Sequence, residues 1–314
     1  MASQHAGAEA AFTLVVPRLG ELCAEARRLP PVLDRMLSRG EHATGTAPHP
    51  LAGLVPGTWP GESVLTRRHD APGDLSGLWL RADPVRMVAD INRVWVAPSF
   101  RPPESQTRQR LQEGLTELFE EQGIVFDWPA PERAYLRLSQ APEAEFEPVW
   151  RIGGRGLDEV LPDGPGAATW RRLINETQML FHQLGTESDG PTSLWFWGPG
   201  RDRAAPSGHG FRGFCGDGPL VRGLADWLEL PAVDAGRAPA AGLVAGWEPD
   251  ARHTAEENLE ALSETWLEPT WRGLGRFRPA AFRLVSNTGR VECRSLHRMR
   301  FWRRRGTGPV AARP

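Results

Sequence analysis

The stretch from residue 170 to residue 200, WRRLINETQMLFHQLGTESDGPTSLWFWGPG, constrains the fold of this chain more than any other. Its first half has the 3.6-residue period of an amphipathic helix. The apolar side of that helix is formed by Trp170, Leu173, Ile174, Thr177, Leu180, Phe181 and Leu184. The continuous apolar run at 193–197 then predicts a strand that is covered on both faces. The stretch therefore predicts a helix, a polar break and a buried strand that ends in a glycine-rich turn.

The opposite face of the predicted helix carries Asn175, Gln178 and His182. A helix that faces only solvent usually has charged residues there, whereas this row consists of two amides and an imidazole. If the face borders a cleft, His182 can donate a proton or contact a phosphate group. If it borders another domain, the same side chains satisfy backbone groups, and the sequence does not decide between the two interpretations.

The glycine-rich turn contains Gly198, Gly200 and Arg201. Backbone N–H groups in such a turn can point toward an anion, and an arginine adds positive charge. The chain contains neither GxGxxG nor GxxxxGK[ST], so a structural tight turn is the favoured interpretation. If the chain has a ligand site, we predict that it binds a small phosphorylated or anionic molecule and is built from Asn175, Gln178, His182, Gly198, Gly200 and Arg201.

Composition excludes several classes of function. The chain has 314 residues, of which 37 are basic and 39 acidic, so the net charge of −2 provides no general attraction for nucleic acid. It contains arginine but no lysine, which excludes Schiff-base chemistry, pyridoxal-phosphate anchoring and the lysine of a phosphate-binding loop. No apolar run approaches the ~18 residues of a membrane span. We therefore expect a cytoplasmic protein without a membrane partner.

The residues that usually form catalytic or metal centres are sparse. Cys23, Cys215 and Cys293 lie far apart, without the close spacing of metal ligands, and fit a reducing compartment. The chain has no GxSxG or HExxH motif, and its aspartates are scattered. The sequence therefore predicts no catalytic residue and no metal ligand.

Alternating patterns along the chain predict its domains. An apolar strand at 12–17, and further strands and helices after residue 185, predict an α/β core made of residues 1–74 and 185–314. The segment between them, 75–168, has the strand and helix patterns of a smaller inserted α+β unit. The helix at 169–184 would connect the two parts.

Two segments invite a functional interpretation that we do not favour. Segment 41–74 is predicted to be an irregular connection, and its histidines His42, His49 and His69 are expected to be exposed to solvent. The C-terminal stretch 294–305 gathers arginines with aromatic residues between them, which is typical of nucleic-acid binding. The rest of the chain has no matching basic stripe, so nucleic acid is the less favoured partner.

Several motifs together resemble a known family. These are RADPV at 81–85, NETQMLFH at 175–182, SLWFWGPG at 193–200 and RFWRRR at 300–305. They resemble an uncharacterised proteobacterial family that is labelled regulatory protein of the RpfE type and is often named phosphoglycerate mutase. More remotely, the order of elements in 175–200 is similar to the archaeal-type cofactor-independent phosphoglycerate mutases. That resemblance implies an α/β fold with a three-layer alkaline-phosphatase-like core sheet, a smaller inserted α+β domain, two divalent metal ions and a phosphorylated serine or threonine.

The chain departs from that superfamily where its metals bind. A metal-binding aspartate is expected directly after the first strand, but the sequence there is Pro17, Arg18, Leu19 and Gly20. Aspartate and histidine ligands are expected near the last strands, but 286–297 reads SNTGRVECRSLH, with His297 alone. A two-metal phosphoryl transfer needs several carboxylates and imidazoles.

We therefore expect a phosphoglycerate-mutase-like protein that has lost its metal centre, binds no cofactor and acts as a regulatory or ligand-binding protein. The alternative is a metal-dependent, 2,3-bisphosphoglycerate-independent phosphoglycerate mutase that uses Mn or Mg. A nucleic-acid-binding regulator that uses Arg303, Arg304 and Arg305 is the third possibility.

Overall fold

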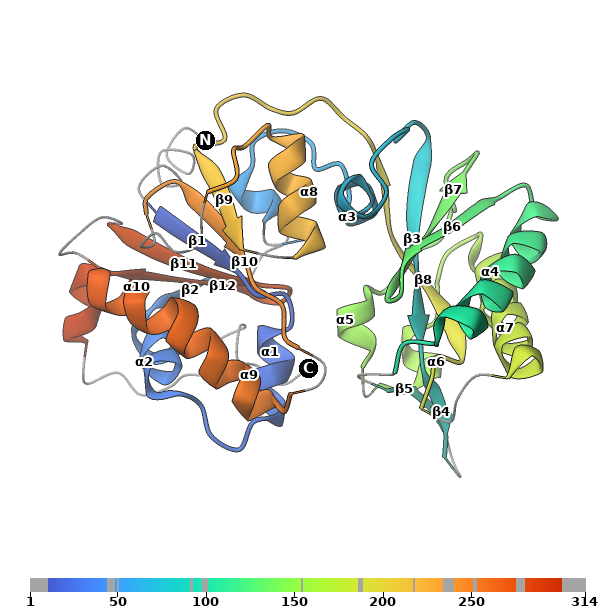
Figure 1. Ribbon diagram of the computed structural model, residues 1–314, viewed down its shortest axis with the longest axis horizontal. Helices are drawn as coiled ribbons and strands as arrows, with labels where there is room; N and C mark the ends of the chain where they lie inside the picture. Colours follow the sequence, from blue (N-terminus) through green and yellow to red (C-terminus); the bar gives the residue numbers. More distant parts are fainter. Residues whose placement is uncertain are drawn as a thin grey trace. The chain divides into compact units, whose positions relative to one another are not determined.

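The chain is organised as two compact units. The computed structural model describes residues 11–43, 49, 51–90, 93–97, 101–153, 155–185, 189–216, 218–233, 240–250, 253–274 and 280–300. Unit 1 consists of Met1–Trp59 and Ala204–Pro314, and unit 2 of Pro60–Arg203 (Figure 1). In the sequence, unit 2 therefore lies between the two segments that form unit 1.

The boundaries of the inserted unit differ from those that the sequence predicted. Unit 2 extends over 60–203 instead of 75–168. The helix at 169–184 is part of unit 2 and not a connection, and the apolar strand at 193–197 lies in unit 2 and not in the core. Both segments pack into the hydrophobic core of unit 2, through residues such as Phe181 and Phe196.

Unit 1 is built on a mostly parallel sheet with the strand order β2-β12-β11-β1-β10-β9. β1 is parallel to β11 and β10, and β10 is parallel to β9, whereas β12 and β2 continue the sheet in antiparallel pairings. The predicted α/β class is therefore confirmed. The strands are β1 (Ala11–Val15), β2 (Glu41–Ala43), β9 (Gly213–Gly216), β10 (Leu243–Gly246), β11 (Ala281–Ser286) and β12 (Gly289–Arg294).

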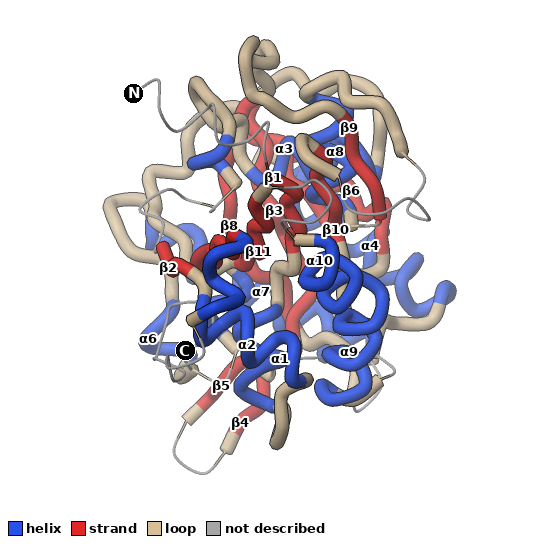
Figure 2. The backbone as a smooth tube through the Cα atoms, turned by 90° about the vertical axis from the view of Figure 1, so that its left-hand side faces the viewer, coloured by secondary structure: helices blue, strands red, loops and turns tan. Residues whose placement is uncertain are grey.

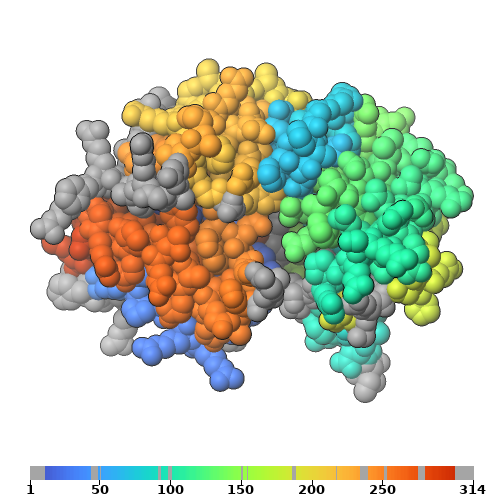
Figure 3. Space-filling model, in the orientation of Figure 1, coloured from blue at the N-terminus to red at the C-terminus, as the bar shows by residue number. Residues whose placement is uncertain are grey.

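Helices cover both faces of this sheet. One face carries four helices, α1 (Leu19–Glu25), α2 (Pro31–Arg39), α9 (Ala255–Leu262) and α10 (Glu268–Gly273), with the π-helical turn η2 (Ser263–Leu267) between the last two (Figures 1 and 2). α8 (Pro219–Trp227) packs against β9 and β10 on the other face. α9 and α10 form part of the outer surface of unit 1 in the space-filling view (Figure 3).

The core of unit 1 follows from the alternation of side chains in its strands. Phe12 of β1 points toward the four helices, where its ring stacks on Trp266 and on Phe282, each at 5.8 Å between ring centroids. All residues of β1 are buried, as expected of a central parallel strand. None of the helices in the described ranges is long and apolar enough to cross a membrane.

Unit 2 is an antiparallel sheet with the order β6-β7-β3-β8. Its strands are β3 (Leu78–Val85), β6 (Val125–Ala130), β7 (Arg133–Leu138) and β8 (Ser193–Arg201). α4 (Ser105–Glu120) and α7 (Ala167–Leu184) contact this sheet through β6 and β8. The smaller elements are η1 (Ala52–Leu54) in unit 1, and β4 (Met87–Ala89), β5 (Val94–Val96), α5 (Val149–Ile152) and α6 (Leu157–Val160) in unit 2.

The two faces of β3 have different chemistry. Leu78, Leu80 and Ala82 belong to the apolar core shared with α4 and α7. Trp79 and Arg81 alternate with them and therefore face the opposite side, where α3 (Glu62–Asp70) packs. The sequence predicted neither this helix, which lies in the supposed irregular connection, nor its polar contacts with the sheet.

Two segments that contain proline belong to strands, and the second of them was predicted to be a turn. Asp83 and Pro84 continue β3, where β7 no longer pairs with it, so the missing N–H of the proline breaks no hydrogen bond on that side. The glycine-rich segment Gly198 to Arg201 continues β8, which lies at the edge of the sheet and tolerates Pro199.

A glycine of β8 allows the chain that leads into α3 to lie close to this strand. A Cβ atom on Gly200 would lie 2.2 Å from the carbonyl oxygen of Pro60, and one on Gly61 would lie 2.6 Å from Gly200 Cα. Gly61 also has φ +99°, a conformation that disfavours other residues. The chain that leads into α3 thus fits against β8 only because both positions are glycine.

Gly200→Ala should therefore destabilise unit 2 by about 1–3 kcal/mol, the usual cost of overpacking. Gly53→Ala is the matched control, because nothing lies within 4 Å of the added Cβ. Hydrogen exchange of β8 amides in mild urea measures the effect. Equal exchange rates in the two variants would show that the close approach is not a constraint.

Candidate functional site

Three neighbouring segments leave the carboxyl ends of parallel strands in unit 1. They are 16–18 after β1, 247–250 after β10 and 286–288 after β11, and we call them the carboxyl edge. Ligands of open α/β sheets bind outside these strand ends. Three backbone hydrogen bonds hold the segments side by side: Trp247 N to Val15 O at 2.9 Å, Val16 N to Val285 O at 2.8 Å, and Asn287 N to Pro17 O at 3.2 Å.

The segment after β10 is fixed by Asn258, a buried residue of α9. The Asn258 side chain accepts a hydrogen bond from Asp250 N at 2.8 Å and donates to three backbone carbonyls, those of Asp250, His253 and Thr254. Thr254 and Glu257 form a capping box at the start of the same helix. The half-buried carboxylate of Asp250 and the exposed imidazole of His253 are thereby held 3.9 Å apart.

The hairpin after β11 presents hydroxyl groups. Ser286 is buried, and its Oγ lies 3.1 Å from Oγ1 of Thr288, which is exposed. Ser286 Oγ also lies 3.2 Å from the carbonyl oxygen of Gly289, so the turn is closed by its own side chain. An exposed Thr288 hydroxyl on a fixed turn can donate a hydrogen bond to a ligand oxygen.

His49 is buried and contacts this hairpin through Asn287. The prediction that it is an exposed loop histidine is therefore wrong. Its side chain is fully buried, hydrogen bonds with the Asn287 side chain and stacks on Trp59 at 6.1 Å. Nδ1 accepts a hydrogen bond from Leu51 N at 3.1 Å. Burial lowers the pKa of His49 to about 4, against the opposing effect of Asn287. The imidazole is therefore neutral and structural at neutral pH.

Arg18 contributes the positive charge after β1, but it is already paired. Its Nε lies 2.6 Å from Oε2 of Glu21 in the first turn of α1. Burial raises the pKa of Glu21, and Arg18 opposes that rise. The guanidinium thus keeps free N–H groups for a ligand, with part of its charge neutralised.

The described residues do not fit a two-metal centre. In the ranges that the structure describes, no group of three or more His, Cys, Asp or Glu side chains is arranged to hold a metal ion. Asp250 and His253 approach each other without a third ligand. His297 follows β12, whose last residue Arg294 pairs with the first residue of β11, so it lies at the amino ends of the parallel strands.

The structure separates the residues that the sequence predicted as one site. Asn175 and His182 are exposed and Gln178 is half-buried on α7, and within the described residues their side chains form no hydrogen bond. Gly198 and Gly200 lie in β8 beside the chain that leads into α3, on the face of the sheet opposite to α7. Arg201 is exposed at the end of β8. Backbone atoms of Pro60 and Gly61 adjoin Gly200, and atoms of Glu62 and Arg81 lie within 4 Å of a Cβ built on Gly198.

A second polar cluster, under α3, is closed on itself. Arg81 donates from Nε and Nη2 to the two carboxylate oxygens of Asp83, each at 2.8 Å, and from Nη1 to Thr66 Oγ1 at 3.0 Å. Trp197 Nε1 donates to Asp83 at 2.7 Å. Burial raises the pKa of nearby Glu62, whose carboxyl forms no side-chain hydrogen bond with a described residue. Because Arg81, Asp83, Thr66 and Trp197 are hydrogen bonded to one another, we assign the cluster to the docking of α3.

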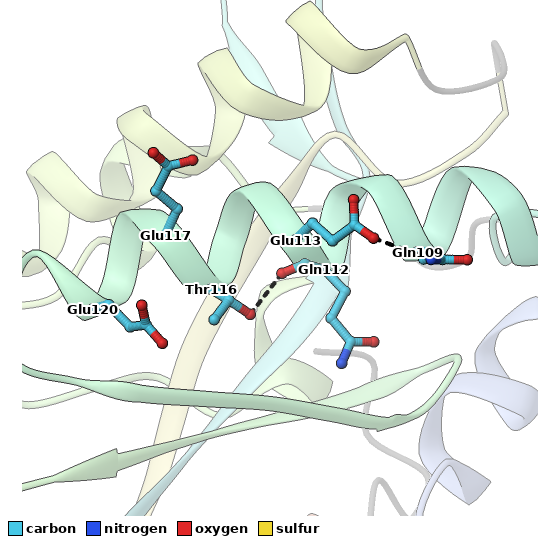
Figure 4. Close-up of a pocket in the computed structure, with 6 residues that line it drawn as sticks. All are labelled: Gln109, Gln112, Glu113, Thr116, Glu117 and Glu120. Atoms are coloured by element: carbon cyan, nitrogen blue, oxygen red, sulfur yellow. Dashed lines mark hydrogen bonds between the residues drawn. The ribbon is translucent and has the colours of Figure 1, made fainter.

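A shallow hollow of about 470 Å³ lies on the outer face of α4 (Figure 4). Its lining comes from a single helix, and the labelled side chains are Gln109, Gln112, Glu113, Thr116, Glu117 and Glu120. Three of the six residues are glutamates and none is basic, so the hollow offers no positive charge to an anionic ligand. The hollow does not compete with the carboxyl edge as a site for such a ligand.

Comparison with known proteins finds only remote likenesses. No protein-family model matches the chain, and no curated protein matches it. It is similar to a cofactor-independent phosphoglycerate mutase from Thermoplasma acidophilum, with 15% identity, a TM-score of 0.38, and coverage of 90% of this chain and 89% of that one. It is also similar to a protein from Pyrococcus horikoshii, with 11% identity, a TM-score of 0.41, and coverage of 90% and 86%. Neither likeness assigns a role to a residue of this chain.

The sequence did not predict a site at the carboxyl edge, although one of its segments has a recognisable pattern. The spacing of Asp250 and His253, with Thr254 and Glu257 forming a capping box, marks a rigid turn into a helix. The burial of His49 left no such signal, because its partners Trp59 and Asn287 are distant in sequence.

His49 should make unit 1 sensitive to acid. Because its folded-state pKa lies below that of an exposed histidine, its stabilising contribution is complete above pH ~6.5 and is lost as the pH falls toward 4. Over that window the loss should reach about 3 kcal/mol, from ~1.4 kcal/mol per pH unit.

His49→Gln should remove this part of the pH dependence, since glutamine does not ionise. His69→Gln is the control, because His69 is exposed on α3. The measurement is the free energy of urea unfolding at pH values from 7 to 4. Hydrogen exchange of core-sheet amides monitors unit 1. Parallel curves for wild type and His49→Gln would contradict the assignment.

Proposed function

We propose that this chain is a phosphoglycerate-mutase-like protein without a metal centre that binds a small phosphorylated or anionic ligand at the carboxyl edge of unit 1. The resemblance of its motifs to the RpfE-type family supports a regulatory role for that binding. The observation that carries the proposal is that backbone hydrogen bonds join the three segments at the ends of β1, β10 and β11.

The chemistry of these segments suits an oxyanion. Arg18 offers guanidinium N–H groups, and Thr288 offers an exposed hydroxyl. His253 adds an imidazole on a segment that Asn258 holds in place. Groups fixed before binding lose little conformational entropy when the ligand arrives, which favours affinity. Glu21 and Asp250 lie beside these donors and would select for a ligand that also has hydroxyl groups.

The row on α7 remains the competing location. Asn175, Gln178 and His182 could together contact a ligand, but they lie on the exposed side of a single helix. The carboxyl edge is favoured because its polar groups come from several elements, as those of small-molecule sites usually do. The two locations can be separated by mutation, since they share no residue.

A metal-dependent mutase is the second candidate, and the approach of Asp250 to His253 favours it. Carboxylate and imidazole groups at the ends of parallel strands are the types of ligand that Mn²⁺ accepts. Such a centre would need further ligands beyond these two. The two candidates differ in whether the ligand binds in the presence of a chelator.

The first test is calorimetric titration of the full chain with 3-phosphoglycerate in EDTA. Thr288→Val and Arg18→Gln should each weaken binding about tenfold, the effect of losing a hydrogen bond to a charged group. The Gln178→Ala/His182→Ala double variant is the control and should bind as the wild type does. Loss of binding in that control alone would place the ligand on α7 and contradict the proposal.

The second test assays mutase turnover with added Mn²⁺. The proposal predicts no turnover and the same affinity with Mn²⁺ as with EDTA. Turnover that depends on Mn²⁺ and is abolished in Asp250→Asn would establish the second candidate in its place.

A further inference from the structure

Two large apolar side chains are exposed together on the short helical turn η3 (Ser295–Met299). Leu296 is 71% exposed and Met299 is 66% exposed, the largest values among the exposed large apolar residues in the described ranges. In a 3₁₀ turn the residues i and i+3 point to the same side. Leu296 and Met299 therefore form one apolar knob, which the proposed ligand site does not use.

The turn that presents this knob is firmly anchored. His297 is buried, and its Nε2 lies 3.1 Å from Glu41 Oε1. Arg300 Nη2 lies 3.2 Å from the same carboxylate, and Arg39 donates to the carbonyl oxygen of Arg298 at 2.6 Å. Burial and the neighbouring Arg300 lower the pKa of His297, against the opposing effect of Glu41. Leu296 and Met299 are therefore exposed on a turn that hydrogen bonds and ion pairs hold in place.

Arginines surround the knob, and some of them have no counter-charge. Arg39 and Arg298 form no ion pair with any described residue, and their hydrogen bonds go to carbonyl oxygens. Arg294 is paired with Glu292 at 2.7 Å but keeps an exposed side chain. Arg303, Arg304 and Arg305, considered above for nucleic-acid binding, lie outside the described residues. The surroundings of the knob therefore have a positive field that an anionic surface would complement.

We propose that η3 and its arginines form a docking site for an anionic phospholipid surface. Apolar side chains that enter the interface and arginines that attract acidic headgroups act together in such binding. Peripheral docking of this kind needs no membrane-spanning helix, so it revises the expectation that the chain has no membrane partner.

Other anionic partners fit the knob less well. Stable protein interfaces bury about 800 Å² on each side, which two exposed side chains do not approach. Single-stranded nucleic acid binds by stacking on aromatic rings, whereas the apolar side chains exposed on η3, Leu296 and Met299, are not aromatic. A lipid surface uses both the aliphatic pair and the cations.

The test is co-sedimentation of the full chain with phosphatidylcholine vesicles, with and without phosphatidylserine. Binding should require phosphatidylserine and should weaken when NaCl is raised from about 0.1 M to about 1 M. Leu296→Ser/Met299→Ser and Arg298→Glu should each reduce the partition coefficient at least fivefold.

Matched controls carry the same changes elsewhere. Val125 and Met179 are exposed apolar residues of unit 2, and Arg110 is an exposed arginine of α4. Val125→Ser/Met179→Ser and Arg110→Glu should bind vesicles as the wild type does. No sedimentation with acidic vesicles, or equal losses in the η3 variants and controls, would overturn the proposal. If vesicle binding is absent, two other results would also overturn the proposal. One is binding of single-stranded RNA that the η3 variants abolish, and the other is self-association that they abolish.

Discussion

The pairing of β1 with both β10 and β11 is the interaction on which the rest of unit 1 depends. It brings residues 11–15 between 243–246 and 281–286, so the sheet forms only when the two ends of the chain meet. The same pairing places the segments after these strands side by side. The place of the proposed site therefore follows from the topology, whereas its side chains come from a few residues in the loops after these strands.

Unit 2 rests on a different constraint, the docking of α3 on a sheet that is polar on that face. Gly61 and Gly200 let the backbone of the incoming chain touch β8. The buried pair of Arg81 and Asp83 then joins α3 through Thr66. Breaking such a pair leaves an uncompensated buried charge, so these contacts specify where the helix sits more than they add to stability.

Local patterns in the sequence predicted much of the fold. The apolar period of α7 and the apolar runs at 12–17 and 193–197 correspond to observed elements, the last two to β1 and β8. α3 escaped prediction because several of its buried residues are polar, among them Ser63 and Thr66, whose hydrogen-bond partners lie on β3. Hydrophobic periodicity does not register a helix that docks through polar groups.

The predicted site residues show the same limit. Asn175, Gln178 and His182 do share one side of a helix, as their spacing indicated. Whether a cleft adjoins that side depends on packing that the spacing does not encode. Gly198 and Gly200 were predicted to form a tight turn, but both lie in strand β8, and the group that approaches Gly200 closely is the backbone of Pro60 and Gly61.

The central claim is that the ligand binds at the carboxyl edge of the core sheet. It is tested most directly by following backbone amide resonances of the full chain during titration with 3-phosphoglycerate. The account predicts the largest shifts at 247–250 and 286–288, with 175–182 unchanged. Shifts confined to 175–182 would contradict it.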